Sequence, residues 1–197
     1  MTIGLKNLVW FPIENESESA ITYGTAVPLA GAIDAQINPN NAEANKLYAD
    51  DVEWDSVTPD SDYNIEVETV GFSAANLAKL QGHTISDDGG VIVKAGDEPP
   101  YGALAFKSEK SKKSGGGYRY VVLYRVKAAF APAAYHTKEG NNFTRQTGKM
   151  TFSAVARMHD GLKQYIIDSQ TDPEDFFTEP ITPVVTPPKP PAATPDP

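Results

Sequence analysis

Apolar and polar side chains alternate along several stretches of the chain, and this pattern predicts a mainly β protein. Tyr63–Val70 places Tyr63, Ile65 and Val67 on one face and polar residues on the other, as in a strand with one buried face. Lys149–Met158 alternates in the same way. Shorter apolar runs predict further strands at residues 6–13, 27–37, 83–85, 91–93 and 101–107.

The strongest strand signal lies in residues 118–129, where aromatic and β-branched residues predominate. Strict alternation predicts one face with Tyr118, Tyr120, Val122, Tyr124 and Val126. The opposite face would then carry Arg119, Val121, Leu123, Arg125 and Lys127. The basic, glycine-containing residues 108–117 before this strand predict a flexible turn, and residues 162–169 fit either a last strand or a helical turn.

One short helix is predicted between Ser73 and Gly82. Serine is a favoured residue at helix N-termini, and Gly82 can take the left-handed conformation that ends a helix. Leu77 and Leu80 lie three residues apart, so they share a face of this helix. Residues 86–90 that follow, Ser-Asp-Asp-Gly-Gly, are typical of a hairpin turn.

Two segments lack a clear pattern of strand or helix. Residues 38–62 make a long connection, and connections of this length are usually functional or disordered. From residue 180 onward, eight of 18 residues are proline, which favours extended conformations over a packed core. We therefore expect one folded domain at residues 1–179 and a disordered or semi-rigid tail at residues 180–197.

Charge is distributed unevenly along the chain. The net charge is −9, which argues against tight binding to a phosphate backbone. Residues 34–98 carry 14 carboxylates against three lysines, whereas residues 99–158 carry 11 basic residues against two glutamates. One interpretation is that strands from the two blocks pair in one sheet, so that their charges cancel locally. The other is that the molecule has two faces of opposite charge, which suit head-to-tail self-association.

No pattern of catalytic or metal-binding residues emerges from the sequence. The three histidines do not have metal-ligand spacing, there is no cysteine, and no serine elbow or phosphate-binding loop is present. The acidic stretch at residues 46–64 lacks the glycine that a calcium loop needs at its turn. Residues 1–13 lack the apolar region of a secretion signal, so a cytoplasmic origin is permitted.

Several stretches together resemble the major tail proteins of long-tailed bacteriophages that infect Gram-positive bacteria. These are MTIGLKNLVWFPI at the N-terminus, NKLYADD at residues 45–51, GYRYVVLYRVKA at residues 117–128 and FTRQTGKMTFSAVAR at residues 143–157. The resemblance covers roughly residues 1–160. It implies an antiparallel β-sandwich or barrel-like tail-tube fold with one short flanking helix, and it does not require the Pro-rich tail.

The resemblance also implies a structural role without enzyme activity, cofactor or bound metal. Hexameric rings of such proteins stack into the tail tube around a tape-measure protein, contact tail-terminator and baseplate proteins, and let DNA pass through the lumen. The expected location is the virion tail, after assembly in the host cytoplasm. In this fold, a long loop between early strands reaches the adjacent ring, and residues 38–62 are the candidate.

The resemblance implies a role in assembly for the acidic stretch at residues 46–64. In a contact between two copies, apolar side chains anchor the loop and charged side chains set its register. The candidate assembly residues in the loop are Leu47, Tyr48, Asp50, Asp51, Glu53, Trp54 and Asp55. The candidate basic residues that would face them on a neighbouring copy are Lys107, Lys110, Lys112, Lys113, Arg119, Arg125 and Lys127. The alternative is a monomeric β-sandwich that binds a ligand such as a glycan on a phage or bacterial surface protein.

Overall fold

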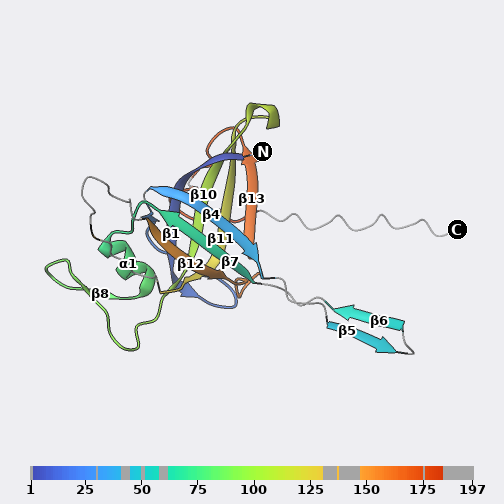
Figure 1. Cartoon of the computed structure of the whole chain (residues 1–197), viewed down its shortest axis with the longest axis horizontal. Coiled ribbons are helices and arrows are strands. Elements are labelled where there is room, and N and C mark those ends of the chain that lie inside the picture. Colours follow the sequence, from blue (N-terminus) through green and yellow to red (C-terminus); the bar gives the residue numbers. More distant parts are fainter. Residues whose placement is uncertain are drawn as a thin grey trace.

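A computed structural model of the chain describes residues 2–29, 31–40, 45–49, 52–57, 62–130, 137, 147–174 and 176–183, with only the backbone described for residues 45–49 and 52–57. This part of the chain is mainly β, with antiparallel pairing and one α-helix (Figure 1). The strands are β1 (Thr2–Glu16), β2 (Ile21–Tyr23), β3 (Val27–Pro28), β4 (Ala32–Pro39), β5 (Asn45–Ala49), β6 (Val52–Val57), β7 (Tyr63–Thr69), β8 (Thr84–Ile85), β9 (Val91–Ile92), β10 (Tyr101–Lys110), β11 (Tyr118–Ala128), β12 (Gly148–Ala154) and β13 (Gln164–Ser169). The helices are α1 (Ala74–Gln81) and the short 3₁₀-helix η1 (Lys112–Ser114).

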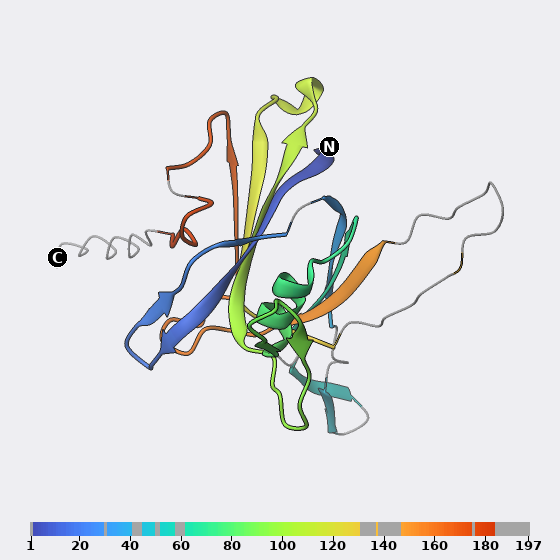
Figure 2. The same cartoon turned by 90° about the vertical axis from the view of Figure 1, so that its left-hand side faces the viewer.

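The nine-stranded main sheet divides into two layers because β11 has two partners along one edge. Residues 118–123 of β11 pair with β13, whereas residues 126–128 pair with β12. The first layer contains β1, β10, β11 and β13, and the second contains β12, β7 and β4. Figure 2 shows the second layer, with β12 in orange, to the right of the long strands of the first layer. The result is a sandwich-like arrangement of two layers.

An apolar core fills the space between the two layers. Leu104 and Leu123 of the first layer and Ile65 and Phe152 of the second have no exposed surface. The alternation predicted for residues 63–70 is confirmed, since Ile65 and Val67 are buried while the residues between them face outward. The transfer of apolar side chains such as these from water is the main force that holds the layers together.

The outer face of the first layer is also apolar, and the C-terminal strap covers it. This strap, residues 170–174 and 176–183, places Phe176 against Tyr120 and Tyr124 of β11 with only 1% of Phe176 exposed. The Tyr124 hydroxyl donates a hydrogen bond to the carbonyl oxygen of Ile181. Both faces of β10 and β11 are therefore mostly buried.

The predicted boundary between domain and tail at residues 179 and 180 is wrong. Pro180 is buried and Ile181 packs against the cluster under the strap, so the folded chain continues at least to residue 181. Ile181, an apolar residue among the prolines, packs in the same cluster as side chains of the distant strand β11. The composition of residues 180–197 did not indicate this packing. The rest of the predicted tail, residues 184–197, lies outside the described residues.

The predicted helix is confirmed together with both of its ends. The Ser73 hydroxyl accepts a hydrogen bond from the backbone N–H of Asn76 at 3.2 Å, and Gly82 adopts the left-handed conformation with φ of 71°. The predicted hairpin after the helix is also confirmed, with β8 pairing to β9. Of the two alternatives for residues 162–169, the strand is correct, because β13 completes the ladder of β11.

The prediction that Val126 shares a face with Tyr124 is wrong because β11 contains a bulge. Leu104 of β10 pairs with Leu123, whereas Gly102 pairs with Val126, so β11 has one extra residue over this interval. An extra residue shifts the alternation of side chains by one position. Val126 consequently lies in the core between the layers, while Tyr124 faces the strap.

Candidate assembly surfaces

The acidic segment between β4 and β7 contains a hairpin rather than an irregular loop. β4 extends to Pro39, and β5 and β6 then pair with each other as a separate two-stranded sheet. In this hairpin the backbone of Leu47 lies opposite Asp55, and that of Tyr48 lies opposite Glu53. The side chains of these four candidates and of Trp54 are not described, and Asp50 and Asp51 lie outside the described residues.

The candidate basic residues do not form one free face, since five of the seven have partners within the chain. Lys107 is the most buried of them, with 8% of its surface exposed. Its ammonium group lies 2.7 Å from the Asp172 carboxylate on the strap and 4.7 Å and 5.3 Å from the ring centroids of Tyr118 and Phe177. Lys107 therefore holds the strap to the sheet through an ion pair and cation–π contacts.

Arg125 and Lys127, at the other end of β11, each have an acidic partner. The guanidinium of Arg125 donates a hydrogen bond to Glu16 at 2.9 Å and stacks 4.1 Å from the ring centroid of Tyr101. The Lys127 ammonium group lies 3.8 Å from Glu98. Glu16 and Arg125 both have mostly buried side chains, so this pair is part of the fold.

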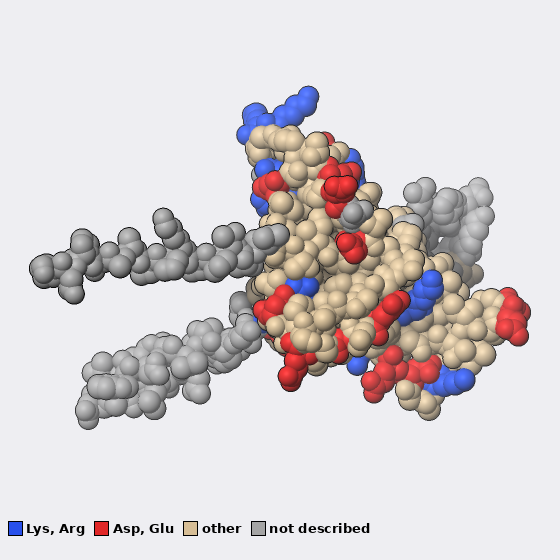
Figure 3. Space-filling view, turned by 180° about the vertical axis from the view of Figure 1, so that it is seen from behind, with Lys and Arg blue, Asp and Glu red and all other residues tan. Residues whose placement is uncertain are grey.

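The hairpin between β10 and β11 retains an excess of positive charge. Lys110 and Arg119 both bind the carboxylate of Asp168, at 2.9 Å each. The hydrogen bond from Arg119, together with a weaker contribution from the Lys110 hydrogen bond, holds the pKa of Asp168 well below its usual range. Lys112 and Lys113 are exposed at the tip and have no ion-pair partner in the described part of the chain. Figure 3 shows this basic tip as the blue projection at the top of the molecule.

Most of the candidate basic residues are neutralised within the fold, but not by the acidic block of residues 34–98, as the first interpretation of the charge pattern expected. The carboxylates that cancel them come mainly from outside the acidic block, from residues 16, 168 and 172. Coulomb attraction acts across close distances in space irrespective of position in the sequence, so block charges alone did not identify these partners. The basic tip remains available for contacts with another molecule.

A flat polar face covers the outside of the second layer. Three rows of side chains cross β4, β7 and β12 on this face, and the register aligns them as Asp34–Glu68–Lys149, Gln36–Glu66–Thr151 and Asn38–Asn64–Ser153. Three of the nine side chains are carboxylates, and only one is basic. The alternation of residues 63–70 predicted Glu66 and Glu68 on an outward face, but it could not show which side chains lie beside them.

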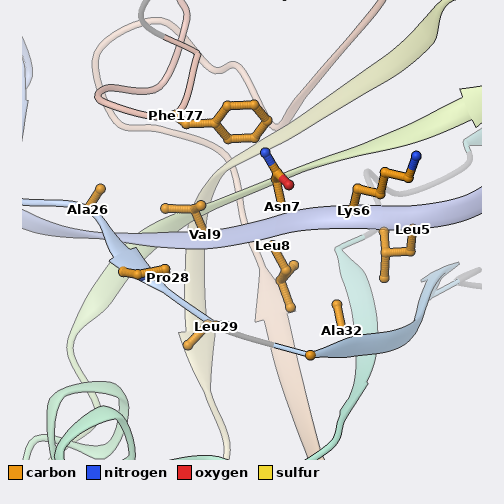
Figure 4. Close-up of a pocket in the computed structure, with 11 residues that line it drawn as sticks. Leu5, Lys6, Asn7, Leu8, Val9, Ala26, Pro28, Leu29, Ala32 and Phe177 are labelled. Carbon is orange, nitrogen blue, oxygen red and sulfur yellow. The ribbon is translucent and has the colours of Figure 1, made fainter.

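An apolar groove lies along the edge of β1. It has a volume of about 730 Å³, within the range of ligand pockets. Figure 4 shows Phe177 of the strap on one side of β1, and Leu29 and Ala32 on the other side. Asn7, in the wall of the groove, has a positive φ of 54°, which is uncommon for a residue other than glycine. No local pattern in the sequence indicated this groove, because its walls come from β1, β3, β4 and the strap.

The histidine near the helix has a structural role. His83 Nδ1 lies 2.8 Å from the Asp97 carboxylate, and its Nε2 lies 3.2 Å from the Gln81 side-chain oxygen. The His83 ring also stacks on Phe130 at 5.8 Å between centroids. Within the described ranges, no group of three or more His, Cys, Asp or Glu side chains is arranged to hold a metal ion.

No protein-family model matches the chain, and no curated protein matches it in sequence. Among the described residues, no helix has the length and apolar character needed to cross a membrane.

Proposed function

We propose that this protein is the building block of a bacteriophage tail tube, a structural protein whose copies form rings, six copies to a ring, that stack around a tape-measure protein. The proposal rests on the resemblance described above and on the mainly β fold. The single observation that supports it most is the combination of the polar sheet face with the projecting β5–β6 hairpin. A tube subunit needs one surface for the lumen and another that reaches the next copy.

The polar face of the second layer has the properties that a lumen wall requires. Its nine side chains are polar, and its three carboxylates exceed its single lysine. Carboxylates repel the phosphates of DNA, and the absence of aromatic side chains from these rows removes surfaces on which bases could stack. DNA would pass such a wall without binding to it.

The other expectations follow from the same role. The partners are further copies of the chain, the tape-measure protein, and the terminator and baseplate proteins at the two ends of the tail. The protein acts in the virion tail after assembly in the host cytoplasm. It has no catalytic function in this proposal.

Electron microscopy of the concentrated protein, together with sedimentation, tests the proposal. We expect rings or hollow tubes from the full-length chain. Deletion of residues 45–56 should give a folded protein, with an unchanged circular dichroism spectrum in the β region, that does not polymerise. Tubes formed by the deletion variant would disprove the role of the hairpin, and a full-length chain that stays monomeric at every concentration would count against the tube itself.

The apolar groove favours a second candidate function, a monomeric β-sandwich that binds a ligand. The groove is large enough for a small ligand, and Lys6 and Asn7 supply polar groups beside its apolar walls. A glycan binder usually presents a flat aromatic platform, whereas Phe177 is the only aromatic residue among the described residues that line this groove. A glycan array probed with the monomer distinguishes the two functions.

A further inference from the structure

The outer edge of β13 offers unpaired backbone groups to another strand. The N–H of Tyr124 donates a hydrogen bond to the carbonyl of Lys163 at 3.0 Å, and this pair lies in the same register as the β11–β13 ladder. Hydrogen-bonded pairs alternate along an antiparallel ladder. The backbone N–H and C=O groups of Gln164, Ile166 and Asp168 therefore point away from β11, where no described strand pairs with them.

The open edges of β1 and β4 have features that discourage pairing with another chain, and β13 lacks these features. In β1, register shifts occur beside Gly4 and Asn7, which both have positive φ. β4 has a register shift near Ile33 and ends with Pro39. Bulges and prolines of this kind block strand addition at edges. β13 pairs with β11 without any register shift.

A cleft with both apolar and polar side chains in its wall borders β13 and β4. It has a volume of about 440 Å³, and its apolar part is formed by Ile33 and Ile37 of β4, Phe106 and Val121 of the first layer, and Ile166 of β13. The polar side chains of Asp34, Arg119 and Gln164 also line it. Ile33 and Ile166 are 49% and 50% exposed. An added strand next to β13 would cover these side chains, and apolar burial would then favour its binding.

The hairpin β5–β6 has the properties of the missing partner. It pairs with no other described strand, and an isolated two-stranded hairpin is marginally stable until it packs against a further sheet. Its sequence carries Asp50, Asp51, Glu53 and Asp55 against the single Lys46. The end of β13 beside the basic tip has the opposite charge, because Lys110 and Arg119 share one carboxylate and two further lysines are unpaired in the described chain.

Figures 1 and 2 show the hairpin below the sandwich and the basic tip above it. A contact between surfaces at opposite ends of one molecule is a head-to-tail contact, which repeats from copy to copy. We propose that the β5–β6 hairpin of a second copy adds to the free edge of β13, with its carboxylates beside Lys112 and Lys113. This inference rests on the self-assembly proposed above and specifies which surfaces meet.

The variant Ile166→Pro tests whether another strand pairs with the free edge of β13. Ile166→Pro removes the outward N–H, whereas the ladder to β11 uses the groups of residues 163, 165, 167 and 169. We expect the variant to fold and to associate about tenfold more weakly in sedimentation than the wild type. Ile166→Thr keeps the N–H and should weaken association less. Val93→Thr, which changes another exposed aliphatic residue, next to β9 and outside the main sheet, should have no effect.

A charge exchange tests the hairpin as the partner. Lys112→Glu with Lys113→Glu should weaken association by about tenfold, and the further changes Glu53→Lys and Asp55→Lys should restore it. If Ile166→Pro forms tubes as well as the wild type does, the β13 contact is wrong while the proposed function stands. If the exchanged charges do not restore association, the hairpin is not the partner. A wild-type chain that remains monomeric at every concentration overturns this inference and the proposed function together.

Discussion

The attachment of the C-terminal strap gives a sharp quantitative prediction through Phe176. This side chain is 1% exposed, and its ring centroid lies 4.8 Å from those of both Tyr120 and Phe177 in edge-to-face geometry. Removal of a buried phenylalanine costs the transfer energy of the ring and leaves a cavity, in total about 3–5 kcal/mol. For a chain of this size, Phe176→Ala should lower Tm by about 10 °C.

Thermal and urea unfolding followed by circular dichroism measure this change. Phe130→Ala is the matched control, because Phe130 is 58% exposed and loses, among the described aromatic rings, only its stacking contact with His83, so the free energy of unfolding should change by no more than about 1 kcal/mol. If Phe176→Ala lowers the free energy of unfolding by less than about 1 kcal/mol, the strap does not contribute to the folded core. The folded domain would then end before the strap.

Two further predictions concern the strap and the close contact of β1 with β10. The hydrogen bond from Lys107, and to a smaller extent that from Tyr120, lowers the pKa of Asp172 in the folded protein. The ionised Asp172 therefore stabilises the fold at every pH above the ordinary Asp pKa, and this contribution is lost as the pH falls through the lowered pKa. Urea midpoints of wild type and Asp172→Asn should differ at neutral pH and converge below about pH 4, and a difference independent of pH would contradict this assignment. Gly102→Ala would place a methyl group against the Trp10 indole and the Phe11 carbonyl, so unfolding experiments should show a loss of about 1–3 kcal/mol, whereas an unchanged stability would show that the two strands can move apart.

The elements whose signals are local could be predicted from the sequence. Ser73 and Gly82 mark the ends of α1 because helix capping depends on residues within one turn of the cap. The period of two in β7 is visible because one face of that strand is buried and the other is exposed. β11 is buried on both faces and contains a bulge, so its strand character was predictable, but the direction of Val126 was not.

The candidate surfaces were decided by the tertiary structure. The sequence marked the acidic segment and the basic residues, but only the fold shows that Lys107 binds Asp172, 65 positions away, and that the lysines of the tip have no such partner in the described chain. The polar face combines three strands that are far apart in sequence, and the free edge of β13 exists because β11 divides its pairing between β12 and β13. Strand pairing and ion pairing depend on distances in space, and local composition and periodicity do not encode these distances.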